Sequence, residues 1–176
     1  RMLNVSDDTL VIDEKGIYSL EKLLIARRLM YWQVYMHKTV LSSESLLVKV
    51  LKRAKTIASE GGDLYSTPAL KFFLRNNIGP ADLGTEGLFT PGIVAFQFTR
   101  LDDSDIYSSA KFWVDSSDKI LSDLSGRLMK RNLFAVELQD DPFQKERLSD
   151  LRDKACLKLK IDPGLEDYYV FTGTIS

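Results

Sequence analysis

The chain has 176 residues, and 44% of them are hydrophobic, which is enough apolar content for a globular domain with a core. Its 24 basic and 25 acidic residues give a net charge of −1, which excludes nucleic-acid binding through overall charge. The single cysteine, Cys156, excludes an internal disulfide and predicts a cytoplasmic protein. The sequence shows no signal peptide and no apolar run of about 20 residues, so we expect no membrane partner.

Several chemistries are excluded by residues that the chain lacks. With one histidine and one cysteine, it cannot build a metal site from several imidazoles or thiolates, and no Walker loop, GxGxxG or nucleophile elbow occurs. We therefore predict no catalytic residue and no metal ligand within this chain. Because residue 1 is Arg rather than Met, we expect this single domain, residues 1–176, to be part of a longer protein.

The first predicted elements are a hairpin and a long helix. Residues 9–18 predict a β-hairpin that turns at Lys15–Gly16. Ser19 is then the expected N-cap of a helix over 19–59, since apolar residues recur there at helical spacing without Gly or Pro. Such a helix would be about 60 Å long, so we expect a bend near 39–45.

The second half of the chain predicts shorter elements. Gly61–Gly62 ends the long helix, a second helix runs from Thr67–Pro68 to about Asn77, and a loop follows over 78–92. Helices are predicted over 93–99, 103–115 and 117–131, and strands over 133–138 and 168–175. Between these two strands, Asp141–Pro142 caps a helix that runs to about Lys160, and Gln144 completes a capping box. The predicted fold class is therefore mainly α (α+β), a helical lobe built on one long helix with a small antiparallel sheet.

Charge is concentrated on the predicted long helix. Residues 19–59 carry a net charge of +6, against −7 for the rest of the chain, which indicates an anionic partner. For the cations from Lys49 to Lys55 we favour a simple solvated face, because the last turns of a helix suit positive charge.

The stretch RRLMYWQVYMHK, residues 27–38, mixes cations with aromatic rings. On a straight helix Arg27, Tyr31 and Lys38 share one stripe, with Tyr35 at its edge and about 16 Å between the two cations along the axis. Such a stripe suits a nucleotide, because arginine binds phosphate oxygens in pairs and a tyrosine packs on a sugar or base. The alternative is a set of core aromatics with Arg and Lys tips reaching solvent.

At these residues the chain resembles a known family. LLIARRLMYWQVYMHKTV, residues 23–40, is similar to the helix that follows the catalytic core in HD-domain deoxynucleoside triphosphate triphosphohydrolases. The shared pattern is Arg27, Tyr35, then His37 and Lys38. RNLF, residues 131–134, also resembles the C-terminal lobe of that family.

The resemblance implies roles for individual residues. It implies that Arg27 binds the substrate triphosphate, that Tyr35 packs by the sugar and base, and that His37 and Lys38 lie near a regulatory nucleotide. Lys15 matches the Lys of the Arg-x-Lys found in allosteric members, although Asp13 stands where their Arg is expected.

The resemblance also implies partners and a cofactor. A divalent metal, Mn, Mg, Fe or Zn, is expected in an N-terminal HD domain absent from this chain, with a nucleoside triphosphate as substrate and a homo-oligomer as the assembly. The alternative from another class is a non-catalytic helical interaction domain that binds a protein or nucleic acid through its basic helix.

The remaining candidate residues favour structural roles. Asp102, with Asp103 and Asp105 in the first turn, predicts a capped helix rather than a metal cluster. Cys156 lies in an apolar helical pattern, which predicts a buried core residue rather than a nucleophile.

Overall fold

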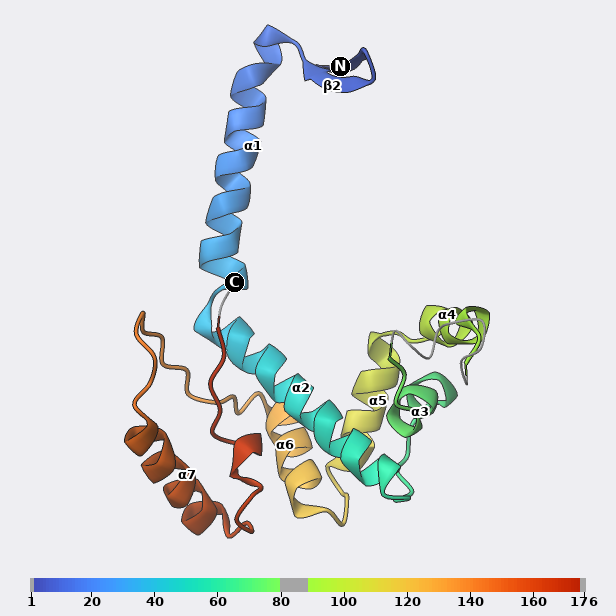
Figure 1. Cartoon of the computed structure of the whole chain (residues 1–176), viewed down its shortest axis with the longest axis vertical. Coiled ribbons are helices and arrows are strands. Elements are labelled where there is room, and N and C mark those ends of the chain that lie inside the picture. Colours follow the sequence, from blue (N-terminus) through green and yellow to red (C-terminus); the bar gives the residue numbers. More distant parts are fainter. Residues whose placement is uncertain (1, 80–88, 175–176) are drawn as a thin grey trace. The chain divides into compact units, whose positions relative to one another are not determined.

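The computed structural model describes residues 2–79 and 89–174 (Figure 1). It is mainly helical with one small antiparallel sheet, which confirms the predicted fold class. Two compact units are present: the first includes the residues up to Leu41, and the second runs over Ser42–Thr174. Of the predicted loop over 78–92, residues 80–88 lie outside the described part.

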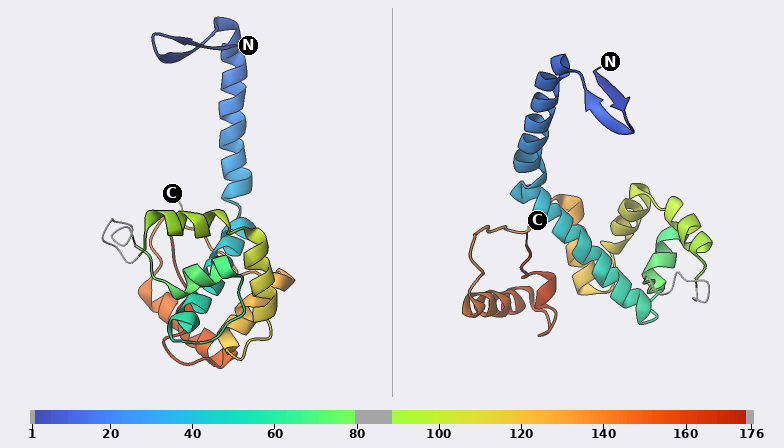
Figure 2. Two further views of the ribbon diagram at one scale, coloured as in Figure 1. Left: turned by 90° about the vertical axis from the view of Figure 1, so that its right-hand side faces the viewer. Right: turned by 45° about the horizontal axis from the view of Figure 1, so that its top comes forward.

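The sheet is a two-stranded hairpin at the start of the chain. β1 (Leu3–Ser6) pairs with β2 (Thr9–Ile12), and the two strands lie side by side in Figure 2. Asp7 and Asp8 form the turn with φ of 50° and 60°, the positive values that a type I′ turn needs. The predicted turn at Lys15–Gly16 was wrong, because these residues lie in a 3-10 helix.

The predicted long helix consists of two α-helices joined by a π-helical turn. α1 (Ile17–Met30) leads into the π turn Tyr31–Tyr35, and α2 (Lys38–Ser59) follows. The break lies at residues 36–37, slightly before the expected bend. α1 begins at Ile17 without a side-chain cap, so the N-cap predicted at Ser19 was wrong.

Gly61 and Gly62 end α2 as predicted. The Gly62 N–H donates to Ile57 O at 2.8 Å and the Gly61 N–H to Ala58 O at 3.3 Å, the bond pair of a Schellman motif. Gly61 has a left-handed φ of 86°. A Cβ on Gly62 would lie 2.5 Å from Ile57 Cγ2 and 2.9 Å from the Ile57 carbonyl oxygen, so this close approach requires glycine.

The second unit has its core between α2, α3 (Pro68–Arg75), α5 (Asp103–Trp113) and α6 (Lys119–Lys130). The cluster of buried apolar side chains at its centre consists of Leu46, Val50, Ala54, Leu70, Leu74, Ala110, Trp113, Ile120, Leu121 and Leu124. Trp113 is 2% exposed, and its indole N–H donates to Tyr65 O at 2.8 Å, so this large ring is buried without an unpaired donor.

The chain after residue 90 departs in part from the sequence prediction. α4 (Pro91–Thr99) and α7 (Lys145–Leu159) are present, but neither 133–138 nor the described residues of 168–175 form a strand. Residues 133–138 are bound to α2 by one side chain, since the Ser42 hydroxyl donates to Phe134 O at 2.9 Å.

Two side-chain predictions in this region were also wrong. Gln144, rather than Asp141, is the N-cap residue of α7, and it makes no side-chain capping bond. Cys156 is partly exposed, with Sγ 3.8 Å from Glu166 Oε2, instead of lying in the core. Partial burial, and then the Glu166 carboxylate, raise the pKa of the Cys156 thiol, so it is not an activated nucleophile.

Candidate functional site

The aromatic and basic residues predicted as a binding stripe lie at the end of α1 and in the π turn. The Arg27 guanidinium carbon lies 5.9 Å from the centre of the Tyr31 ring, and Tyr31 meets Tyr35 edge-to-face at 5.2 Å. The two tyrosines are 44% and 52% exposed. We call Arg27, Tyr31 and Tyr35 the Arg27 cluster, and it exposes a guanidinium and two phenol rings to solvent.

A second cation–aromatic pair lies beside this cluster. The Arg28 guanidinium carbon is 5.6 Å from the Trp32 ring centre, and Trp32 is 67% exposed. Because successive helical residues are rotated by about 100°, this pair points in a different direction from Arg27. The described residues of the chain bury none of these rings.

The stripe that joins Lys38 to Arg27 was predicted for a straight helix, and the helix between them is not straight. The π turn changes the number of residues per turn, and the helix ends before His37, so Lys38 is the first residue of α2. The N–H of Thr39 donates to Nδ1 of His37, two residues earlier in the chain, at 3.2 Å. His37 is exposed and caps α2, which leaves its Nε2 open to solvent.

Lys15 lies in the 3-10 helix that precedes α1. Its amine is 3.7 Å from Asp13 Oδ2, and the two side chains are 77% and 56% exposed. An ion pair this exposed is weak, so Lys15 is free to meet an anion.

The aspartates around Asp102 form a helix cap, as predicted. Asp102 Oδ1 accepts from the Ser104 N–H at 2.7 Å and the Asp105 N–H at 3.2 Å, while Asp105 Oδ2 accepts from the Asp102 N–H at 2.9 Å. The bond from the Asp105 N–H, and then those from Ser104, lower the pKa of the Asp102 carboxyl. Within residues 2–79 and 89–174, no group of three His, Cys, Asp or Glu side chains could hold a metal ion.

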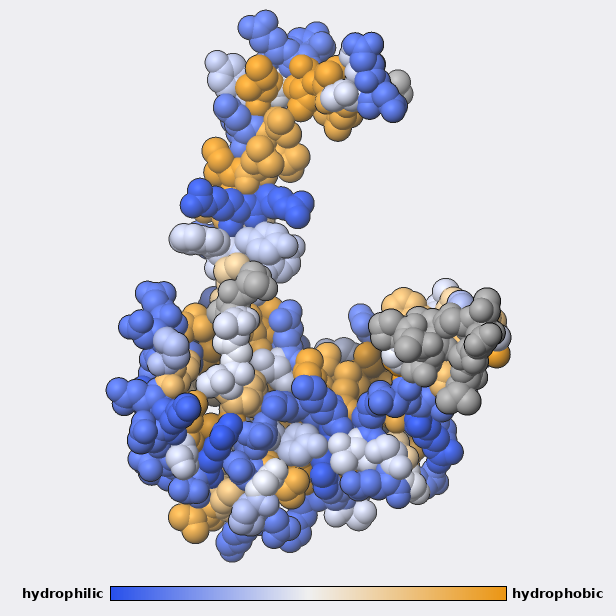
Figure 3. Space-filling model, in the orientation of Figure 1, coloured by the Kyte–Doolittle hydropathy of each residue, from blue (hydrophilic) through white to orange (hydrophobic). Residues whose placement is uncertain are grey.

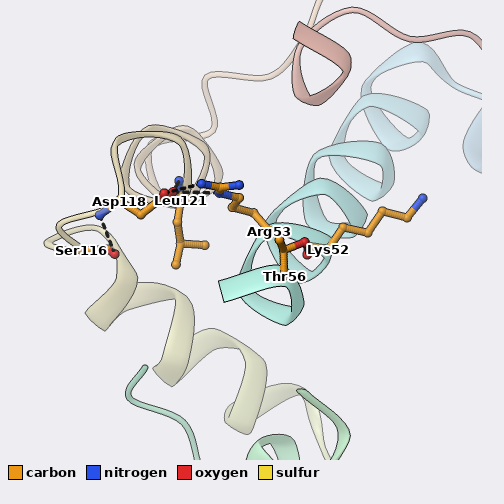
Figure 4. A network of polar contacts seen from close by, with 6 residues as sticks. All are labelled: Lys52, Arg53, Thr56, Ser116, Asp118 and Leu121. Carbon is orange, nitrogen blue, oxygen red and sulfur yellow. Dashed lines mark hydrogen bonds and ion pairs between the residues drawn. The ribbon is translucent and has the colours of Figure 1, made fainter. Parts of the chain in front are cut away.

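The basic residues late in α2 are partly used inside the second unit. Arg53 donates to both oxygens of Asp118, from Nε at 3.1 Å and from Nη2 at 2.6 Å (Figure 4). Lys49 donates to Asp167 O and lies 4.3 Å from the centre of the Phe171 ring. The predicted solvated face was therefore wrong for these two cations, and they are not available to a protein or nucleic-acid partner.

Asp118 has two tasks in this network. Besides binding Arg53, its Oδ1 accepts from the Leu121 N–H at 2.8 Å and so caps α6 (Figure 4). The Arg53 hydrogen bond is the main cause of a lowered pKa of the Asp118 carboxyl. The pair is not apparent in the sequence because its members are 65 residues apart, although an Asp before a helical pattern does signal a cap.

The first part of the chain matches a known protein family. Residues 1–65 match the family described as "HD associated region". This match includes the hairpin, α1, the π turn and α2, and with them every residue of the Arg27 cluster. Residues 1–65 are therefore similar to an HD-associated region.

Two longer proteins are similar to the chain. A crystal structure described as a phosphohydrolase from Bacteroides thetaiotaomicron is 42% identical, with a TM-score of 0.89, over 99% of this chain and 43% of that chain. "Uncharacterized protein YwfO" of Bacillus subtilis is 33% identical over 134 residues, which are 76% of this chain and 28% of that protein. The chain thus spans less than half the length of either relative.

Across the described residues, no helix combines the length and the apolar character that crossing a bilayer requires.

Proposed function

We propose that the chain is the C-terminal, substrate-contacting and oligomerisation lobe of a metal-dependent HD-family phosphohydrolase that acts on (deoxy)nucleoside triphosphates in the cytoplasm. The observation that carries this proposal is the Arg27 cluster, an exposed guanidinium with two exposed phenol rings inside an HD-associated region. The similarity to part of a phosphohydrolase supports it.

The side chains of the cluster match the parts of a nucleotide. A guanidinium forms paired, charge-assisted hydrogen bonds with phosphate oxygens, so Arg27 binds the triphosphate of the substrate. Tyr35 packs beside the sugar and base. His37, Lys38 and Lys15 are exposed and contact a phosphate or a regulatory nucleotide.

The chemical step belongs to the rest of the proposed enzyme. A divalent metal, Mn, Mg, Fe or Zn, held by an HD domain would supply the activated water, and the described residues of this chain offer no group that fits such an ion. This lobe therefore contributes binding and orientation of the triphosphate, which raise the rate by holding the reacting phosphorus in place.

Replacing Arg27 tests the assignment, and Arg28 provides a matched control on the same helix. In the full-length protein, Arg27→Lys keeps the charge but loses the paired geometry, so we expect kcat/KM to fall about tenfold to 150-fold, the cost of losing charge-assisted hydrogen bonds of about 1.5–3 kcal/mol. Arg28→Lys, which points elsewhere, is expected to lose about threefold at most.

The measurement is steady-state hydrolysis of a deoxynucleoside triphosphate by both variants, with thermal melts to show that each is folded. Small and equal effects at the two positions would contradict the phosphate contact and leave the Arg27 cluster as a packing surface.

A further inference from the structure

The second unit contains a small cavity between three of its helices. It has a volume of about 120 Å³, lies between α2, α5 and α6, and is lined by Ser43, Glu44, Leu47, Asp103, Ile106, Tyr107, Ala110 and Leu128. Figure 3 shows orange, apolar side chains between α2 and α5, with blue, charged side chains beside them. We call this space the Tyr107 cavity. All of its lining residues belong to the second unit, whereas the Arg27 cluster belongs to the first.

The interior of the Tyr107 cavity is apolar and its mouth is acidic. Ala110 is fully buried and forms the floor, and the leucine and isoleucine side chains of the lining are half-buried above it. Glu44 and Asp103 are exposed, so their carboxylates lie where the cavity opens to solvent. Tyr107 is 59% exposed and adds an aromatic ring to the mouth.

The two carboxylates at the mouth lack partners. Within residues 2–79 and 89–174, neither the Glu44 nor the Asp103 side chain forms a hydrogen bond or an ion pair. Neither acid has a Lys or Arg three or four positions away on its own helix, whereas Asp123 on α6 pairs with Arg127 at that spacing. Two unpaired carboxylates at one opening repel each other, so a cation between them is favoured.

The apolar walls decide which kind of cation suits the cavity. A divalent metal ion needs about six oxygen ligands, and no group in the described part of the chain could hold one. An alkylammonium ion fits better, because its charge pairs with the carboxylates and the Tyr107 ring while its alkyl chain leaves water. Since an apolar cavity of about 150 Å³ can hold benzene, the Tyr107 cavity has room for about four or five carbons.

We propose that the Tyr107 cavity binds a small aliphatic primary amine, with the alkyl chain inside and the ammonium group between Glu44 and Asp103. The order of these two parts separates this ligand from a lysine side chain of a partner protein. A lysine would enter with its charged end first and bury an ammonium against the apolar floor, and a diamine would do the same with one of its charges. This site uses no residue of the Arg27 cluster, so its test is independent of the hydrolysis test.

Titration of the 176-residue chain with n-pentylamine tests the site, followed by amide chemical shifts in NMR spectra. For a cation of this size we expect a dissociation constant of about 1 mM, with shifts confined to amides near residues 43–47, 103–110 and 128. Ethylamine lacks three methylenes, each worth about fourfold, so it should bind about 60-fold more weakly. Uncharged 1-pentanol should bind at least about fivefold more weakly, and 1,5-diaminopentane at least about tenfold.

Variants at the mouth test the role of the carboxylates. Glu44→Gln and Asp103→Asn each remove one charge from an exposed position, so each should weaken n-pentylamine binding about two- to fivefold without unfolding the chain. Together they should make n-pentylamine and 1-pentanol bind equally well. Asp115→Asn is the matched control, since Asp115 is exposed beyond the other end of α5 and outside the cavity, and this variant should bind like the wild type.

A variant of the wall tests the interior. Leu128→Phe places a larger side chain in the cavity, so n-pentylamine and 1-pentanol should both lose binding, with circular dichroism confirming that every variant is folded. Absence of n-pentylamine binding, or equally tight binding of 1-pentanol to the wild type, would overturn the proposal and leave the cavity as an apolar recess. Equal losses for Asp115→Asn and Glu44→Gln, or shifts at amides away from the cavity, would overturn it as well.

Discussion

Arg53 and Asp118 form an ion pair whose side chains are 16% and 23% exposed. By contrast, Asp63, which pairs with Lys71 and Arg75, is 85% exposed. Partial burial weakens screening by water, and two hydrogen bonds fix the geometry of Arg53 on Asp118, so this pair contributes to stability while the Asp63 pairs contribute little.

Substitutions of Asp118 separate its charge from its capping role. Asp118→Asn keeps a good N-cap residue but loses the charged partner of Arg53, so we expect about 1–3 kcal/mol less free energy of unfolding. Asp118→Ala also loses the cap of α6 and is expected to cost about 1 kcal/mol more. Urea unfolding measures both, with Asp63→Asn, expected within about 0.5 kcal/mol of wild type, as the control. Equal effects at Asp63 and Asp118 would contradict the role of burial.

The same pair predicts a dependence of stability on pH. The Arg53 hydrogen bond lowers the pKa of Asp118 in the folded protein, whereas in the unfolded chain the pKa is near 3.9. The stabilisation is therefore present above about pH 4 and is lost as the pH falls through the lowered folded pKa. The difference in unfolding free energy between wild type and Asp118→Asn should shrink below about pH 4, and a difference that stays constant down to about pH 2 would exclude this linkage.

At the scale of elements, local signals decide which predictions are confirmed. Three helix ends depend on only a few neighbouring residues each, and the structure has all three: the cap of α5 at Asp102, the start of α3 at Thr67–Pro68 and the end of α2 at Gly61–Gly62. The hairpin turn was misplaced because Asp7–Asp8 contains no glycine, even though aspartate tolerates positive φ. Residues 133–138 have the composition of a strand but no pairing partner, which composition does not reveal.

The candidate site could be predicted from the sequence only in part. The spacing of Arg27 and Tyr31 placed them together, and they are in contact. The π turn before Lys38 was not predictable, because Tyr31–Tyr35 has no residue such as Pro or Gly to mark it. A helical spacing rule therefore applies only up to the π turn.

The glycine turn that ends α2 allows a prediction about stability. Gly62→Ala places a Cβ within 2.9 Å of the Ile57 carbonyl oxygen, so the turn must shift, and we expect a loss of about 1–3 kcal/mol. Gly126 is a matched control inside α6, where a Cβ would have nothing within 4 Å. Gly126→Ala should stabilise the chain by about 0.5–1 kcal/mol through helix propensity. Thermal melts compare the two, and a stabilising Gly62→Ala would contradict the close approach.

At the scale of the whole molecule, the proposed function separates binding of a nucleotide from the activation of water. The Arg27 cluster lies in the first unit, and neither unit has a metal-binding group among its described residues. The two relatives are more than twice as long as the region they share with this chain, which supports the proposal that catalysis needs further sequence.

We therefore expect the purified 176-residue chain to release no triphosphate from dGTP, with or without Mn²⁺, Mg²⁺ or Fe²⁺. Binding of a nucleotide positions the triphosphate, but breaking the bond to phosphorus requires an activated water, which an HD domain would supply by holding a metal. The assay compares the chain with Arg27→Ala at equal concentration, because contaminating hydrolases give the same rate in both preparations. Triphosphate release that exceeds this control would mean that the chain is itself an enzyme, and would place the catalytic groups among its own 176 residues.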